Sequence, residues 1–145
     1  MPAVHWKWRS RHAALTLAEM ARQAWSAGQR FDAIVCSDML DLAAWKGLVG
    51  DPLNRLPTVA YFHENQLTYP LSPGQRRDYH FGYTNILSAV AAEETWFNSD
   101  FHRREFCAAA TSWLRRMPDY RHLDLLDSAM HGARVVPPGI EPCPW

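Results

Sequence analysis

Apolar positions in the first half of the chain switch between helical spacing and short continuous runs. Between residues 10 and 27 they recur at the i, i+3, i+4 spacing of one helix face, and Gly28 is well placed to end that helix. The runs at 31–36 and 57–62 are rich in apolar, β-branched and aromatic residues, which is typical of buried strands. Residues 40–45 carry a short helical pattern. This half therefore predicts helix, strand, helix and strand.

The second half continues the alternation. Helical patterns begin near residues 78, 100 and 123, and short strand-like runs lie at 95–97 and 133–136. The first of these helices is expected to carry one apolar face made of Tyr79, Tyr83, Ile86, Leu87, Val90 and Ala91. The second is expected to carry a stripe made of Phe101, Glu105, Ala109 and Trp113.

The predicted order is helix, strand, helix, strand, helix, strand, helix, helix, strand, as expected of a parallel sheet covered by helices. We therefore predict an α/β fold: a Rossmann-like parallel sheet with helices on both faces. Right-handed crossovers bring the carboxyl ends of parallel strands to one edge, where ligands bind in such folds. The residues expected along this rim are Ser37, Asp38, His63, Glu64, Asn65, Asn98, Ser99 and residues 139–141.

Composition bounds the class of protein. A chain of 145 residues can bury one ordinary core, and its fifteen basic and fifteen acidic side chains cancel, so a nucleic-acid partner would have to meet a local patch. The three cysteines are scattered, without the spacing of a disulfide framework, which fits a reducing cytosol. No apolar run approaches the ~20 residues that cross a bilayer. We expect a cytoplasmic protein with no membrane partner.

The most informative segment is Tyr-Phe-His-Glu-Asn-Gln-Leu-Thr-Tyr-Pro at residues 61–70, where polar groups directly follow a predicted strand. His63 could transfer a proton, orient a hydroxyl or stabilise charge, or it could cap a helix or bond a carbonyl. Glu64 could act as a base or accept from a ligand hydroxyl, or bond loop amides. Asn65 and Gln66 are ligand donors or loop braces. His63 and Glu64 are the catalytic candidates.

Other rim residues offer both structural and binding roles. Ser37 and Asp38 could cap the helix that follows them or contact a substrate. Asn98 and Ser99 favour a helix cap, although the N-terminus of a helix is also a phosphate site. Gly139 allows close backbone approach or a turn, and the prolines around it favour the turn.

His80 lies on a polar face of the helix that begins near residue 78, where it either reaches the same cleft or is solvated. A metal site is not expected, because the sequence has no His-Glu-x-x-His or Cys-x-x-Cys spacing.

One local basic patch stands near the start of the chain. Residues 1–12 contain no acid, and Lys7 and Arg9 alternate with Trp6 and Trp8. Interleaved cations and aromatic rings can hold phosphates and stack on bases. The alternative is that the tryptophans mainly pack against the domain. We treat these four side chains as RNA-binding candidates.

Four motifs occur in order: His-Trp-Lys-Trp-Arg at 5–9, the long string at 61–70, Phe-Asn-Ser at 97–99 and Met-Pro-Asp at 117–119. Together they resemble the N-terminal domain of the tRNA-queuosine alpha-mannosyltransferase family. Members of this family are GT-B glycosyltransferases related to the large retaining family 4. The similarity covers nearly the whole chain.

The resemblance implies transfer of mannose from GDP-mannose to the cyclopentenediol of queuosine in a tRNA anticodon, with retention at the anomeric carbon. No tightly bound cofactor is implied. The N-terminal domain of such enzymes mainly receives the acceptor, and a second Rossmann-like domain holds most of the nucleotide sugar. His63 would then contact the transferred sugar, and Glu64 and Asn65 would position hydroxyls.

The same resemblance implies that residues 1–141 form a partial acceptor-side domain and that residues 142–145 begin a linker or tail. We expect one half of a GT-B architecture, truncated at its N-terminus and without transferase activity alone. Two other hypotheses stay open. One is a family-4-like glycosyltransferase with a lipid or small-glycoside acceptor, and the other is a non-catalytic module that binds RNA or a nucleotide.

Overall fold

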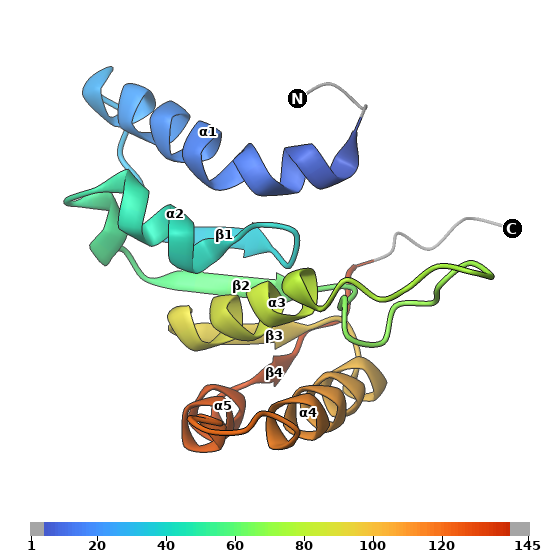
Figure 1. Ribbon diagram of the computed structural model, residues 1–145. Coiled ribbons are helices and arrows are strands. Elements are labelled where there is room, and N and C mark those ends of the chain that lie inside the picture. The colour runs from blue at the N-terminus through green and yellow to red at the C-terminus, as the bar shows by residue number, and fades with distance from the viewer. Residues whose placement is uncertain (1–4, 140–145) are drawn as a thin grey trace, which may run out of the picture.

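The computed structural model describes residues 5–139, so the predictions for residues 140–145 lie outside the described residues. The helices are α1 (Trp6–Ser26), α2 (Leu42–Val49), α3 (Tyr79–Ala91), α4 (Asp100–Arg115) and α5 (Leu123–His131), with a 3-10 turn η1 (Leu53–Arg55). The strands are β1 (Ile34–Ser37), β2 (Thr58–Phe62), β3 (Glu94–Phe97) and β4 (Arg134–Val135). The predicted order of helices and strands is confirmed (Figure 1).

The four strands form one all-parallel sheet in the order β1-β2-β3-β4, which confirms the α/β, Rossmann-like class. Ser37, the last residue of β1, lies opposite Tyr61 in β2. Beyond the strands, the amide of Asp38 donates to the Tyr61 carbonyl at 3.1 Å and the amide of Asn98 donates to the Phe62 carbonyl at 3.0 Å. The segments that follow β1, β2 and β3 are thereby held at one edge of the sheet.

The helices cover the sheet unequally. α1 lies beside α2 at one end of the molecule and α4 and α5 lie at the other, with α3 between them (Figure 1). We predicted helices on both faces, and helices do flank the sheet, but β2 alternates between buried and half-buried residues and Val35 in β1 is 66% exposed. The side of the sheet that carries Val35 is therefore the more open one. Of the helices in residues 5–139, none has the length and apolar character to cross a bilayer.

Two helix starts differ from the prediction. α1 begins at Trp6 rather than near residue 10, so the basic and aromatic motif forms its first turn. α2 is capped by Asp41, whose Oδ1 accepts from the Ala44 amide at 2.9 Å, and not by Ser37 or Asp38. α1 can start early because alternating tryptophans and cations do not oppose helix formation, although they give no apolar stripe to signal it.

The buried faces of α3 and α4 are rotated from those expected. The buried residues of α4 are His102, Phe106, Ala110 and Leu114. The predicted stripe lay one position earlier, and its first member, Phe101, is 70% exposed. The buried residues of α3 are Phe81, Gly82, Asn85, Ile86, Ser88 and Ala89, whereas Tyr79, Tyr83, Leu87 and Val90 are exposed. Both helices carry apolar residues on more than one side, so periodicity alone did not select the side that meets the sheet.

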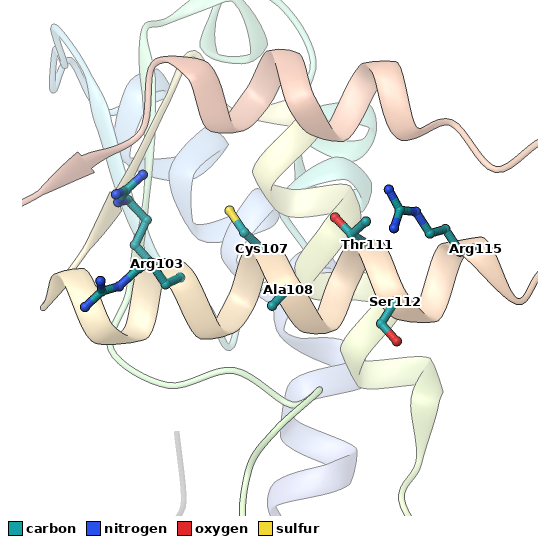
Figure 2. Close-up of a pocket in the computed structure, with 7 residues that line it drawn as sticks. Arg103, Cys107, Ala108, Thr111, Ser112 and Arg115 are labelled. Carbon is teal, nitrogen blue, oxygen red and sulfur yellow. The ribbon is translucent and has the colours of Figure 1, made fainter.

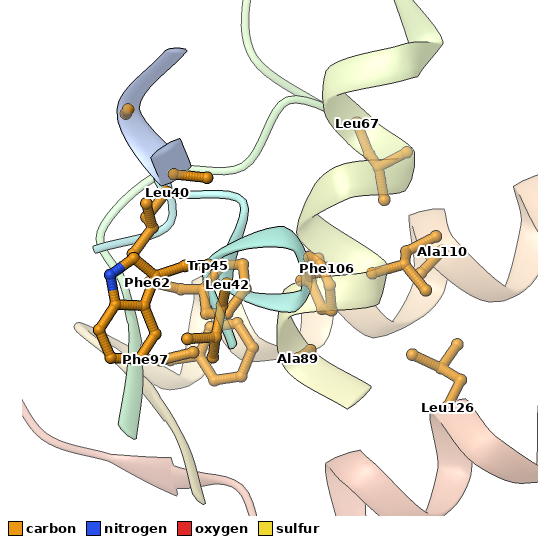
Figure 3. Close-up of a cluster of buried hydrophobic side chains, with 14 of the residues drawn as sticks. Leu40, Leu42, Trp45, Phe62, Leu67, Ala89, Phe97, Phe106, Ala110 and Leu126 are labelled. Atoms are coloured by element: carbon orange, nitrogen blue, oxygen red, sulfur yellow. The ribbon is translucent and has the colours of Figure 1, made fainter. Parts of the chain in front are cut away.

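The core is centred on three phenylalanine rings. Phe62, Phe97 and Phe106 are fully buried, with ring centroids 5.0 to 5.6 Å apart. Figure 3 shows these rings near Leu42 and Trp45 of α2. Since Phe62 and Phe97 are the last residues of β2 and β3, this buried aromatic cluster lies next to the edge that presents His63.

Candidate functional site

Asp38 and His63 form a pair at the carboxyl edge of the sheet. The Nδ1 atom of His63 lies 2.6 Å from Oδ1 of Asp38, and the backbone amide of His63 donates to the same oxygen at 3.4 Å. Asp38 follows β1 and His63 follows β2, so parallel pairing of these strands brings the two residues together. The Asp38 side chain is fully buried, whereas half of the His63 side-chain surface is exposed.

This geometry sets which atom of His63 meets a ligand. A carboxylate only accepts hydrogen bonds, so Nδ1 carries the proton that faces Asp38. The neutral ring then presents Nε2 as an acceptor, able to take a hydrogen bond or a proton from a hydroxyl. If the ring is protonated, Nε2 becomes a donor to an oxygen anion, with Asp38 stabilising the added charge. The pair can therefore serve a sugar hydroxyl or a phosphate oxygen.

Burial perturbs Asp38. Removal from water raises the pKa of the Asp38 carboxyl from 3.8 to about 6, although the nearby His63 works in the opposite direction. Oδ2 of Asp38 is buried and has no hydrogen-bond partner among the described residues. At pH 7 the carboxylate form still prevails, because the pH lies above that pKa. Asp38 was predicted to bind substrate, but its burial lets it act on a ligand only through His63.

The loop after His63 is held rigidly from inside. Oδ1 of Asn65 accepts from the amides of Leu67 and Thr68 at 3.1 and 3.0 Å, so the buried Asn65 side chain braces the turn. The Asn85 side chain in α3 accepts from the Gln66 amide at 2.9 Å and donates to the Asp38 carbonyl at 2.8 Å. Asn85 thus ties the loop to the residue that holds His63. Of the two roles left open for Asn65, the structure places it as a loop brace.

Glu64 and Gln66 face a groove of about 700 Å³. We call this the loop groove, and it lies between the first turn of α1 and residues 64–78. Nε2 of Gln66 donates to Oε1 of Glu64 at 3.2 Å, so the two side chains are held together at its wall. Each keeps further hydrogen-bonding capacity for a ligand. His63 at the sheet edge and Glu64 in the groove therefore serve adjoining surfaces.

The N-terminal motif divides between this groove and the outer surface. Trp6 and Lys7 line the loop groove. Trp6 also packs against Phe81, with ring centroids 5.3 Å apart. Trp8 is 65% exposed, so the alternative of tryptophans mainly packed against the domain does not describe it. Arg9 is half-buried and its Nε atom is buried without a partner among the described residues, so Arg9 offers less to RNA than Lys7 does.

The remaining candidates split between the rim and elsewhere. Nδ2 of Asn98 donates to the His63 carbonyl at 3.0 Å, and Ser99 caps α4 by accepting from the His102 amide at 3.2 Å. Both residues lie at the predicted rim, and the hydrogen bonds of their side chains are mainly structural. His80 is exposed and lines a separate hollow with Ser10, Arg11 and Asp41.

Ser37 and Gly139 complete the predicted rim. Ser37 is exposed at the end of β1, where its carbonyl accepts from the Leu40 amide. Gly139 is exposed, its φ is not in the left-handed range, and a Cβ there would meet nothing within 4 Å. Its conformation therefore does not require glycine.

A second groove, of about 610 Å³, runs along α4 on the far side of the core. It is lined by Arg103, Arg104, Cys107, Ala108, Thr111, Ser112 and Arg115. Figure 2 shows Cys107 and Thr111 pointing toward α5. Burial raises the pKa of the Cys107 thiol, which disfavours the reactive thiolate. Asp100 pairs with Arg103 and Arg104, leaving this groove only mildly basic.

Metal ligation gains no support from residues 5–139, in which no three His, Cys, Asp or Glu side chains stand close enough to share an ion. The Asp38–His63 pair alone provides too few ligands for a stable site.

Comparison with known proteins identifies the family. The model of the family "tRNA-queuosine alpha-mannosyltransferase N-terminal" matches residues 1–140. The chain belongs to this family. The tRNA-queuosine alpha-mannosyltransferase of Drosophila melanogaster is 36% identical over 121 residues, which cover 83% of this chain and 31% of that protein. No solved structure matches the chain.

Membership in the tRNA-queuosine alpha-mannosyltransferase N-terminal family confirms the resemblance carried by the string at 61–70. Sequence reasoning nonetheless missed the pairing of Asp38 with His63 and the role of Arg77. Arg77 donates to the carbonyls of Gln66 and Tyr69 at 2.8 and 2.9 Å and so ties together two points of the loop that lines the groove. The Asp38 pairing had a signal, since both residues lie within two positions of the end of a predicted strand. Arg77 lay among turn residues and gave none.

Proposed function

We propose that these residues form the acceptor side of a retaining mannosyltransferase that moves mannose from GDP-mannose to queuosine in tRNA. The observation that carries this proposal is the Asp38–His63 pair at the carboxyl edge of a parallel sheet, beside the loop groove. Ligands of open α/β sheets bind at that edge. Family membership supplies the class of sugar and acceptor.

His63 is assigned to the sugar that moves. As the bond between mannose and GDP breaks, positive character develops at the anomeric carbon, while the acceptor oxygen forms the new bond and loses its proton. An imidazole that Asp38 fixes in one orientation can hold a mannose hydroxyl through Nε2 without reorganising during the step.

Glu64 and Gln66 are assigned to the diol of the acceptor. Their side chains are already hydrogen-bonded to each other at the wall of the loop groove. A carboxylate accepts from hydroxyls, and an amide can both donate and accept. The pair thus suits two neighbouring hydroxyl groups, and the loop braces at Asn65 and Arg77 hold it in position.

The chain spans 31% of the length of the Drosophila relative. The proposal therefore assigns only the acceptor side of the reaction to these residues and leaves the donor nucleotide to other parts of such an enzyme. We expect residues 1–145 alone to bind the acceptor without turnover.

The test measures binding of the chain to two anticodon stem-loops, one with queuosine and one without. Binding is monitored by fluorescence anisotropy across a series of salt concentrations. We expect tighter binding of the queuosine form, and a preference that falls about three- to tenfold with Glu64→Ala, because one hydrogen bond to the diol is lost. Glu19→Ala is the matched control, since it removes an exposed glutamate of α1.

Three results would count against the proposal. Equal binding of both stem-loops would indicate general RNA affinity of a non-catalytic module. An unchanged preference in Glu64→Ala would remove Glu64 from the acceptor site. Absence of RNA binding by the wild-type chain would contradict an acceptor role for these residues.

A further inference from the structure

Three aromatic side chains line the loop groove: Trp6, Tyr69 and Phe81. Phe81 is buried, whereas Trp6 and Tyr69 remain exposed. Trp6 rests against Phe81 with an interplanar angle of 42°, which fixes the indole without burying it. Exposed aromatic rings that lose no packing partner on ligand binding are suited to stack on a base.

The backbone of Tyr69 is fixed by hydrogen bonds at both its amide and its carbonyl. Its amide donates to the Asn65 carbonyl at 3.1 Å, and its carbonyl accepts from Arg77 at 2.9 Å. The ring projects from a fixed point, so little backbone entropy is lost when a base stacks on it. Arg77 acts here as a positioning residue, since both ends of its guanidinium bind loop carbonyls.

Three cationic side chains line the same groove, and Arg77 among them is bonded to the loop carbonyls. Lys7 and Arg76 are exposed, and neither forms an ion pair with a carboxylate of the described residues. The acids of the groove are Glu64, bound to Gln66, and Asp78, whose Oδ1 caps α3 by accepting from the His80 amide at 3.1 Å. Both carboxylates of the groove are therefore already hydrogen-bonded, whereas the cationic groups of Lys7 and Arg76 are available to bind a phosphate.

We propose that the loop groove binds an unpaired tRNA nucleotide next to queuosine, with its base stacked on Tyr69 or Trp6 and its phosphate held by Lys7 and Arg76. The volume of about 700 Å³ is within the range of small-molecule sites, ~300–1,000 Å³. This assignment rests on the proposed function, because it places the neighbouring nucleotide beside the residues that receive the diol.

A nucleotide could also come from the sugar donor, but the surface favours an RNA strand. Trp8, also in the first turn of α1, is 65% exposed and lies outside the groove. It offers a strand of several nucleotides a further aromatic surface, which a single nucleotide bound in the groove does not need. Stacking and phosphate contacts also tolerate different bases, as a site for a flanking nucleotide must.

The experiment uses the whole chain and a stem-loop that carries 5-iodouridine on the 3′ side of queuosine. Irradiation is expected to crosslink this base to the peptides that contain Tyr69 or Trp6. Arg76→Gln is expected to lower the slope of log affinity against log salt by about 0.7, the loss of one single-strand phosphate contact. Tyr69→Leu is expected to weaken binding about fivefold or more.

The control variant is Arg115→Gln, which removes an exposed arginine of α4 from the other groove. Both groove variants should weaken queuosine and unmodified stem-loops equally, because they read a neighbour and not the modified base. That outcome differs from Glu64→Ala, which changes the preference between the two stem-loops. RNA binding that depends on Tyr69 and Arg76 but does not discriminate queuosine would refute the proposed function, while the groove would still be a site for an unpaired nucleotide.

Four results would overturn the groove assignment. These are no crosslink at the groove, equal losses in Arg115→Gln and Arg76→Gln, loss of the crosslink on adding GDP-mannose, and no RNA binding by the wild-type chain. The third would make the groove a site for the donor nucleotide. The fourth would remove the proposed function as well. Circular dichroism of each variant confirms that the exposed substitutions leave the fold intact.

Discussion

Asp38→Asn removes a carboxylate that the fold buries beside His63, and its effect on stability has a defined pH dependence. Burial raises the pKa of Asp38 from 3.8 to about 6. The folded state therefore binds the Asp38 proton more tightly than the unfolded state does. The free energy of unfolding that Asp38 contributes is greatest below pH 4 and is lost as the pH rises through about 6. Asparagine cannot ionise and carries no such loss.

The magnitude follows from the size of the shift. A difference of about two pKa units, at 1.36 kcal/mol per unit, corresponds to about 3 kcal/mol. Between pH 4 and pH 8 the stability of Asp38→Asn relative to the wild-type chain is therefore expected to rise by about 2 to 3 kcal/mol. Urea unfolding, monitored by circular dichroism at unit steps of pH, measures this difference.

The control is Asp32→Asn, which removes an exposed carboxylate outside the site. We expect this variant to stay within about 0.5 kcal/mol of the wild type throughout. Parallel curves for Asp38→Asn and the wild-type chain would refute the burial argument. If the stability of Asp38→Asn relative to the wild-type chain instead fell with rising pH, attraction between Asp38 and His63 would outweigh the loss of hydration.

Two further pairs of substitutions test the packing. Phe106→Ala is expected to lower the free energy of unfolding by about 3–5 kcal/mol, whereas Phe101→Ala on the exposed side of α4 should change it by less than about 0.5 kcal/mol. Equal losses of stability in the two variants, measured by urea unfolding, would instead favour the buried face of α4 that the sequence predicted. Gly82→Ala would place a Cβ 2.6 Å from Cδ2 of Leu67, so we expect a loss of about 1–3 kcal/mol. The control is Gly47→Ala in α2, where an added Cβ has no neighbour within 4 Å, and it should stabilise the chain by about 0.5–1 kcal/mol. A thermal midpoint that rises in both glycine variants would contradict the contact between residue 82 and Leu67.

Much of the site was visible in the sequence because its signals are local. His63 and Glu64 follow a strand that β-branched and aromatic residues mark clearly, and Ser99 precedes a helix that it does cap. The role of Asn65 was left open between ligand donor and loop brace. Its hydrogen bonds to the amides two and three residues ahead decided for the brace. Such a bond depends on a turn whose shape is set by contacts with Arg77 and Asn85.

By itself the sequence determined the order of the elements, the parallel sheet, the edge at which polar residues gather and the family. These follow from periodicity, turn residues and motifs that act over a few positions. Only the tertiary structure decided which face of α3 and α4 is buried, that Asp38 holds His63, and that Trp6, Lys7, Tyr69 and Arg76 line one groove. Each of these depends on contacts between segments far apart in the chain. A local sequence pattern does not specify which distant segment a helix face will pack against.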